Sequence, residues 1–382
     1  MPSSLWASVA VSVMALATVL VAAVIAFKLY WQRIRFALKS TGGAVPARPP
    51  SSLRVLSLNV FTLPWGFSSD GDGDCKNERL SALCQRHLGK FDVVGLQELF
   101  GGPSGRRDAV LALAKRAGLK YHAGPFPPRL LSGRLIDGGC VLLSRYPLES
   151  VDFHEYRHRL FPDSVSCKGV LCASLRLGPE ASLPVFVTHL QASYSLDDAP
   201  SAEVRRRQLE ELRVVVEERA GKEGGAVVMG DFNTDAADAA GYAAVQRALP
   251  AFEDAVLAKK GSHVPTCCVR FNAETGREVG PCEPVTAQGR HAAFLSAASD
   301  EAVNFRDVAQ TIDYIFVRSG GEDGLALRID EAEVEPFREK GPGFESISDH
   351  AGVRATLSLQ SAAEVQPRDS GHDDARVTGE VE

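Results

Sequence analysis

The segment from Val227 to Asn233 carries the clearest candidate for chemistry in this chain of 382 residues. Three apolar residues predict a buried strand, Gly230 lets the backbone turn, and Asp231 and Asn233 follow two positions apart. In an extended chain these two side chains point to the same side. A carboxylate and a carboxamide so placed suit a phosphate or a metal that prefers oxygen ligands. Taken alone, however, the pair is more typical of an Asx turn or a helix cap, so residues elsewhere must decide.

Further polar side chains stand at or beside the ends of other predicted strands, which cover 53–60, 93–96, 185–190, 312–317 and 352–359. In chain order these side chains are Asn59, Glu98, His189, Asp313, Asp349 and His350. Each has an ordinary structural explanation, such as a turn former or a surface acid. A glutamate is costly to bury without a partner, so surface residue and metal ligand both stay open for Glu98.

The order of elements predicts an α/β layered domain, because a charged helix at 203–219 is followed by a buried strand. We expect three parts: an anchor and linker at 1–52, a catalytic domain at 53–360 and a disordered acidic tail at 361–382. The stretch 259–305 has little periodicity and much Gly, Pro and Ser, which favours a functional loop or lid.

The first part predicts a membrane anchor. Ala7 to Phe27 is free of charged residues and long enough to cross a bilayer as a helix. The basic residues that follow are Lys28, Arg33, Arg35, Lys39 and Arg48. By the positive-inside rule they predict a single-pass protein with its catalytic domain in the cytosol. A cleaved signal peptide is the alternative, but the basic n-region is missing.

Composition limits the partners. The net charge of −6 provides no general basic field for nucleic acid, and Arg205 to Arg207 is best interpreted as a solvated helix face. We expect no nucleic-acid partner and infer no protein partner.

The eight cysteines lack CxxC pairs and are interpreted mostly as buried thiols in a reducing compartment. A zinc site is disfavoured because the spacing of the candidate ligands fits no common pattern; these are His263, Cys267, Cys268, Cys282 and His291.

In this order the motifs resemble those of the endonuclease/exonuclease/phosphatase (DNase I-like) superfamily. The matching pieces are Leu58-Asn59, Gln97-Glu98, Thr188-His189-Leu190, Gly230-Asp231-Phe232-Asn233, Ile312-Asp313-Tyr314 and Ser348-Asp349-His350. The resemblance covers roughly Leu53 to Leu359, and six motifs in register are hard to match by chance. The resemblance implies a four-layer α-β-β-α sandwich, with two packed mixed β-sheets flanked by helices.

Within the superfamily the chain looks most like the neutral sphingomyelinases. The pieces that carry this resemblance are Gly139 to Pro147, Lys168-Gly169-Val170 and Thr188 to Ala192. Inositol polyphosphate phosphatases usually carry a Trp near the Gly-Asp motif and an Arg after it, and neither occurs from Met229 to Asp235.

The resemblance also implies roles. Glu98, supported by Asn59, would hold Mg²⁺, with Mn²⁺ as the alternative ion. His350, oriented by Asp349, would be the general base, which we favour over Asp231 because a histidine titrates near neutral pH.

The remaining roles concern the substrate. Asp231 and Asn233 would position the phosphate and the nucleophile, and Lys168 would also bind substrate. His189 would donate to a non-bridging oxygen or to the leaving group, and Asp313 would orient one of the histidines.

We therefore expect a membrane-anchored, Mg²⁺-dependent phospholipid phosphodiesterase that converts sphingomyelin, or a related sphingo- or lysophospholipid, to ceramide and phosphocholine. The alternatives are a metal-dependent nuclease or a phosphoinositide phosphatase of the same superfamily. An inactive membrane-tethered adaptor is a third possibility, against which the presence of every motif side chain argues.

Overall fold

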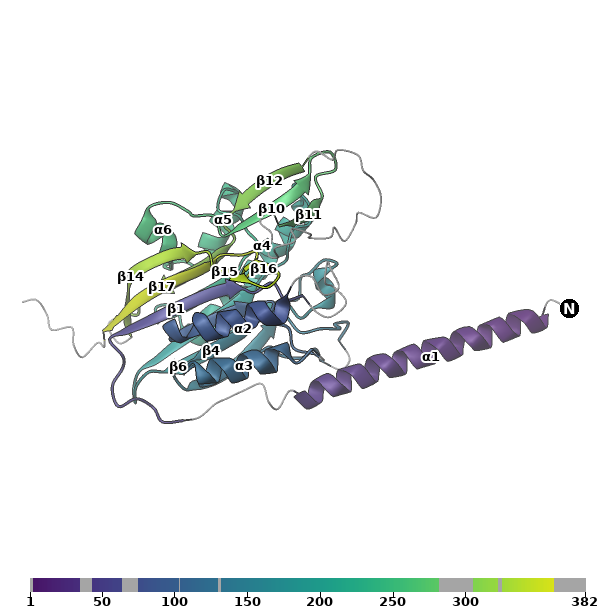
Figure 1. Cartoon of the computed structure of the whole chain (residues 1–382), viewed down its shortest axis with the longest axis horizontal. Coiled ribbons are helices and arrows are strands. Elements are labelled where there is room, and N and C mark those ends of the chain that lie inside the picture. The colour runs from purple at the N-terminus through teal and green to yellow at the C-terminus, as the bar shows by residue number, and fades with distance from the viewer. Residues whose placement is uncertain are drawn as a thin grey trace, which may run out of the picture.

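The layered body of the protein is built on two six-stranded sheets, as the computed structural model shows (Figure 1). The structure describes residues 3–34, 43–63, 75–102, 104–129, 132–281, 305–321 and 325–360. The predicted acidic tail at 361–382 lies outside these ranges.

The first sheet has β1 and β2 side by side and parallel, with antiparallel neighbours on either side. Its strands, in spatial order, are β14 (Ala326–Glu335), β17 (Gly352–Gln360), β1 (Ser52–Asn59), β2 (Val93–Gln97), β4 (Val141–Ser144) and β3 (Tyr121–Ala123). β1 and β2 are nearly continuous runs of buried residues, because one face packs on the second sheet and the other lies under helices.

The second sheet repeats this plan, since β7 and β8 are parallel and the remaining pairs are antiparallel. Its order is β5 (Leu148–Glu155), β6 (Gly169–Arg176), β7 (Ser182–His189), β8 (Ala226–Asp231), β13 (Asp313–Arg318) and β9 (Glu253–Asp254). Gly95 of β2 packs against Met229 of β8, where an added Cβ would come 2.7 Å from the Met229 sulfur. The two sheets therefore meet face to face.

Three apolar clusters correspond to the three interfaces of a four-layer sandwich. The central cluster joins both sheets, for example Leu142 with Val187 and Met229. The second packs the first sheet against α2 (Lys76–Arg86) and α3 (Arg106–Arg116). The third packs the second sheet against α4 (Ala199–Ala220) and α5 (Ala239–Ala248). The predicted arrangement of two mixed sheets flanked by helices is confirmed.

In the part that the structure describes, the stretch 259–305 is not the irregular loop that its composition predicts. It begins at the end of α6 (Ala255–Lys260) and continues into a small antiparallel sheet of β10 (Cys267–Asn272), β11 (Glu278–Pro281) and β12 (Phe305–Gln310). Residues 282–304 lie outside the described part. The remaining short elements are η2 (Leu88–Lys90), η3 (Asp163–Val165) and the hairpin of β15 (Arg338–Gly341) and β16 (Phe344–Ser346).

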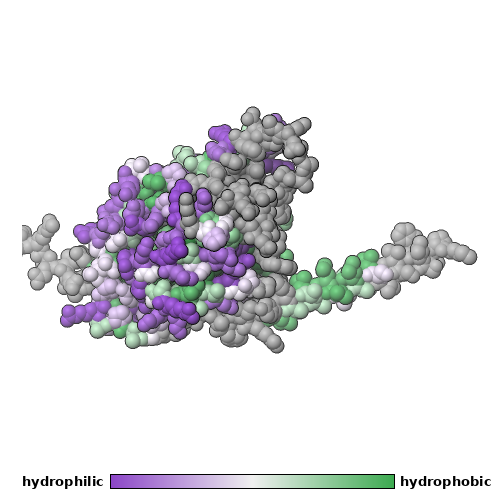
Figure 2. All heavy atoms as spheres, in the orientation of Figure 1, coloured by the Kyte–Doolittle hydropathy of each residue, from purple (hydrophilic) through white to green (hydrophobic). Residues whose placement is uncertain are grey.

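The N-terminal segment forms one helix of 32 residues, α1 (Ser3–Ile34), which projects away from the body (Figure 1). Its described side chains, from Ser12 to Ala26 and at Leu29, are all exposed, and most of their surface is hydrophobic (Figure 2). Across the residues that the structure describes, no helix combines the length and apolarity that crossing a bilayer requires. The anchor at 7–27 stays a prediction.

Most of the cysteines that the structure describes follow the predicted pattern. Free thiols are present at Cys75, Cys84, Cys140, Cys167, Cys172 and Cys267, and all but Cys75 are buried. Cys268, in contrast, is disulfide-bonded. This bond removes one ligand from the disfavoured zinc site and is unexpected for a reducing compartment.

Candidate active site

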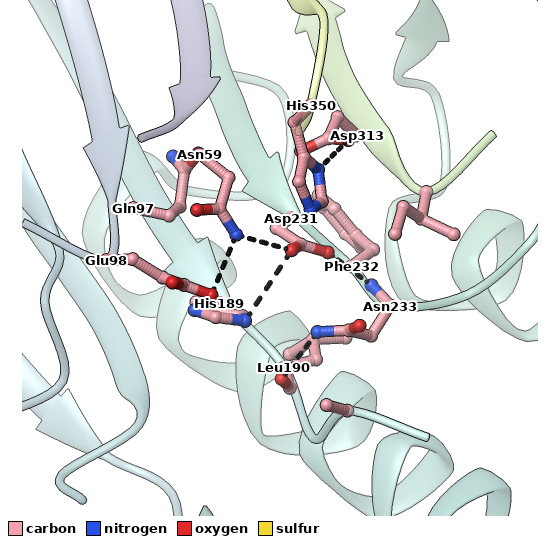
Figure 3. Close-up of polar contacts among 12 residues, drawn as sticks. Asn59, Gln97, Glu98, His189, Leu190, Asp231, Phe232, Asn233, Asp313 and His350 are labelled. Carbon is pink, nitrogen blue, oxygen red and sulfur yellow. Dashed lines mark hydrogen bonds and ion pairs between the residues drawn. The ribbon is translucent and has the colours of Figure 1, made fainter. Parts of the chain in front are cut away.

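The predicted site residues converge where strand ends of the two sheets meet. In the first sheet Asn59 pairs with Gln97, the last residue of β2, and Glu98 follows it. In the second, Asp231 at the end of β8 lies between His189 of β7 and Asp313 of β13. The parallel strands finish at this edge and the antiparallel β13 begins there, so residues far apart in sequence face one another (Figure 3).

Asn59 joins the two sheets. Its Nδ2 donates to Glu98 Oε1 at 3.1 Å and to Asp231 Oδ2 at 3.0 Å, while its Oδ1 accepts from the Phe61 amide at 3.0 Å (Figure 3). The side chain is 1% exposed. Both ends of the carboxamide are thus engaged, and Asn59 holds two carboxylates in place rather than offering a free ligand oxygen.

Glu98 is held in a strained position with one carboxylate oxygen unpaired. Its φ is 57°, a conformation that costs free energy in a residue with a Cβ. Gly139 packs so closely that an added Cβ would lie 2.9 Å from the Glu98 Cα. Oε2 is buried without a hydrogen-bond partner among the described residues. Burial and the neighbouring Asp349 raise the pKa of Glu98 to about 7, which is the environment of a carboxylate that lacks a cation.

His350 carries its own counter-charge. Its Nδ1 lies 2.8 Å from Asp313 Oδ2, and Asp313 is buried in the core of the site. Burial alone would lower the pKa of His350, but Asp313, Cys267 and Asp349 together hold it well above its ordinary value. The imidazole therefore donates from Nδ1 to Asp313, and Nε2 is left to face the site.

The acid that orients His350 is consequently Asp313. The sequence motif had indicated Asp349, and that prediction is wrong. Asp349 Oδ1 instead accepts from its neighbour Ser348 Oγ at 3.2 Å. The reason is sheet register, which places Asp313 directly beside Asp231 and under the imidazole. Adjacent residues in a motif need not touch through their side chains.

Lys168 is buried in the protein and is not free to bind substrate. Its Nζ lies 2.7 Å from Asp163 Oδ2 and 3.1 Å from His189 Nε2, and donates to the Leu190 carbonyl at 2.7 Å. Because ammonium only donates, His189 Nε2 accepts and the ring proton resides on Nδ1. Burial and Lys168 lower the pKa of His189 to about 4. His189 is therefore a neutral donor at physiological pH.

Asp231 and Asn233 form the Asx turn that was the ordinary explanation, and they lie in the site as well. Asp231 Oδ1 accepts from the Asn233 amide at 2.8 Å, and Asn233 has a φ of 48° instead of extended backbone. Asn233 Nδ2 donates to the Leu190 carbonyl at 3.1 Å. Burial acts to raise the pKa of Asp231, yet His189, His350 and Asn59 hold it below its ordinary value, so this carboxylate is ionised.

Two supporting residues escaped sequence reasoning. Arg79 of α2 is fully buried and donates to the carbonyls of Val60, Phe61 and Ile347, which ties the Asn59 strand end to the loop before His350. Asp137 accepts from the amides of Gly139 and Gly101, which closes the loop around Glu98. No pattern marks a single buried arginine on a helix, whereas Asp137-Gly138-Gly139 was visible as a turn signal.

Two positions could hold a cation. The first is at Glu98. The second is the group Asp231, Asp313 and His350, in which one atom of each residue lies within 4.8 Å of the others. The pairing of His350 with Asp313 favours a protonated imidazole that would repel a cation. Glu98 has an unpaired oxygen and makes no direct ion pair with a described residue, whereas Asp313 is already paired with His350, so Glu98 fits a metal better.

Comparison with known proteins assigns the family. Residues 56–350 match the model of the Endonuclease/Exonuclease/phosphatase family. The chain belongs to this family. A sphingomyelinase of Dictyostelium discoideum is 26% identical over 333 residues, which cover 71% of this chain and 72% of that protein. The chain is thus a phosphoric diester hydrolase similar to sphingomyelinases.

Solved structures support the fold. Sphingomyelinase C from Streptomyces griseocarneus aligns with a TM-score of 0.56 and 20% identity, over 80% of this chain and 99% of that one. A beta toxin variant from Staphylococcus aureus with bound magnesium ions aligns with a TM-score of 0.53 and 18% identity, over 80% and 99%. At these identities the similarity establishes the DNase I-like architecture.

Proposed function

We propose that this phosphoric diester hydrolase cleaves sphingomyelin into ceramide and phosphocholine, or releases the phosphorylated headgroup from a related sphingo- or lysophospholipid. The observation that carries the proposal is the convergence of Glu98, Asp231 and His350 through Asn59 and Asp313. The similarity to a sphingomyelinase of D. discoideum supports this substrate class.

The chemistry requires a base, donors and a positioned nucleophile. In its neutral form His350 takes a proton from water at Nε2, and Asp313 holds the ring by the hydrogen bond at Nδ1. Ionised Asp231 orients the water, whose oxygen bonds to phosphorus while the bond to the ceramide oxygen breaks. The ceramide oxygen takes up a proton from solvent water, and His350 then returns its proton to solvent. His189 donates its Nδ1 proton in a hydrogen bond to a phosphate oxygen, with Lys168 fixing the tautomer.

We propose Mg²⁺ as the cation, held by Glu98, with Mn²⁺ as the alternative. When bound, the cation neutralises the anionic diester, stabilises the charge that develops in the transition state, and favours neutral His350. Glu98 contributes one unpaired oxygen, and Mg²⁺ is commonly bound by one or two carboxylates with several waters.

The test uses the full chain in detergent micelles with sphingomyelin, lysophosphatidylcholine, a phosphoinositide or plasmid DNA, each with Mg²⁺ or with chelator. We expect release of phosphocholine from a choline lipid, and its loss on chelation. His350→Ala should lose at least about 100-fold in turnover while keeping the fold. The matched control is His158→Ala, whose half-exposed side chain lies on a different loop. Plasmid nicking as the sole activity would refute the lipid substrate and favour a nuclease.

We also propose that the N-terminal segment anchors the enzyme in a membrane, from the uncharged run at 7–27. The basic residues after it favour a cytosolic catalytic domain, whereas the disulfide at Cys268 is more typical of an oxidising compartment. A glycosylation acceptor added to the acidic tail decides between these orientations. It stays unmodified if the domain is cytosolic, and glycosylation would refute that orientation.

A further inference from the structure

Exposed large apolar side chains on the body are concentrated in one place. Outside α1, the described residues with such side chains are Leu135, Phe161, Tyr194, Leu196 and Val214. The first four lie on three loops, which we call the apolar rim, and Val214 lies apart on α4. Phe161 is 80% exposed. A phenylalanine held so far into water is unfavourable for a protein surface unless something covers it.

The three loops of the apolar rim are hydrogen-bonded to one another. The Leu135 amide donates to the Val165 carbonyl at 2.7 Å, which joins the first loop to the turn after Phe161. The Tyr194 hydroxyl donates to Asp163 Oδ1 at 2.7 Å, which joins that turn to the third loop, where Leu196 lies. These bonds hold the apolar side chains on a fixed platform.

This platform borders the active site. Asp163 accepts from Tyr194 through one oxygen and pairs with Lys168 through the other at 2.7 Å. Lys168 in turn lies 3.1 Å from His189 Nε2. Three contacts therefore lead from the exposed Tyr194 to His189 in the candidate active site.

The charges beside the apolar rim fit a phospholipid surface. Arg157 and Arg159 are exposed and stand four and two residues before Phe161. Arg159 also lies 3.7 Å from Glu155. The segment therefore places two exposed cations just before an exposed apolar side chain, the combination that binds phosphates and the upper acyl region at a bilayer interface.

We propose that the apolar rim enters the interfacial layer of a phospholipid bilayer, with Phe161 as its deepest side chain, and so presents the site to a diester at the membrane surface. This partner follows from the proposed lipid substrate, since the rim adjoins His189 and has phosphate-binding cations beside it. The contact itself needs no turnover, so the two proposals can fail separately.

The first experiment compares Phe161→Trp with Val214→Trp in the full chain, reconstituted into phosphatidylcholine vesicles with or without brominated acyl chains. The natural tryptophans, Trp6, Trp31 and Trp65, give the same background in both. We expect bromine to quench the indole introduced at 161 and to leave the one introduced at 214 unquenched. Equal quenching at both positions, or none at 161, would overturn the apolar rim as a membrane contact, and the latter is also what a protein partner would give.

The second experiment links the contact to turnover. Phe161→Ser combined with Leu196→Ser should reduce sphingomyelin hydrolysis in vesicles about tenfold more than hydrolysis of a water-soluble nitrophenyl phosphodiester, because less apolar area enters the bilayer. Val214→Ser is the matched control and should change neither rate. Equal losses on both substrates would contradict the proposal. Quenching at position 161 without any sphingomyelin hydrolysis would refute the substrate and leave the membrane contact standing.

Discussion

Glu98 and His350, on two sides of the site, differ in whether the protein itself supplies a partner for each polar atom. His350 has Asp313 at 2.8 Å, so this side is complete within the chain. Glu98 shares one oxygen with Asn59 and keeps the other unpaired within the described residues. The His350–Asp313 pair is therefore already formed within the chain, whereas Glu98 keeps an unpaired oxygen at the position where we propose that the cation binds.

The largest effect is expected from Glu98→Gln. We expect hydrolysis to fall by about 10³-fold or more, on the order of 4 kcal/mol in activation free energy, because the neutral amide no longer holds the cation. Thermal melting provides the second measurement. Mg²⁺ should raise the melting temperature of the wild type and not that of the variant.

The control for this substitution is Glu78→Gln, which changes an exposed glutamate in the first turn of α2. It should keep both the activity and the response to Mg²⁺. If the wild type melts at the same temperature with Mg²⁺ as with chelator, Glu98 is not the cation site.

Asp313→Asn removes the negative charge that pairs with His350. Asp313 helps to hold the pKa of His350 above its ordinary value, and the base must be neutral to act. Wild-type kcat/KM should therefore rise with pH through this raised pKa. The variant should lose about 100-fold in kcat, and its acidic limb should move to lower pH. An acidic limb that stays in place would show that another group is the base.

Gly139→Ala tests whether the backbone contact of Gly139 holds Glu98 in position. Gly139 has a φ of 68°, and an added Cβ would meet the backbone of Glu98. We expect about tenfold lower activity and a higher Mg²⁺ concentration for half-maximal rate, since a displaced Glu98 binds the cation less well. Gly133→Ala is the matched control, with no atom within 4 Å of the added Cβ. Equal effects of the two substitutions would contradict the inference that packing against Gly139 fixes the position of Glu98.

The sequence predicted elements best where a strand is buried on both faces. β1, β2 and β8 are such strands, and their apolar runs mark them without reference to the rest of the chain. β10 and β12 were missed because their sequences mix apolar with charged and polar residues, such as Arg270, Asn272 and Asp307. The hydrophobic periodicity of short strands in a small sheet is too weak to distinguish them from a loop in the sequence.

Most of the residues that meet at the candidate site could be picked out from the sequence, because carboxylates, amides and imidazoles at strand ends are recognisable from residue type and local pattern. The tertiary structure alone decided which of them touch. Register set Asp313 under His350 in place of Asp349, and the meeting of two sheets let Asn59 join Glu98 to Asp231. The physical reason is that strand pairing and sheet packing fix side-chain partners that lie 37 to 172 residues apart in the sequence, and local spacing does not encode which strands pair.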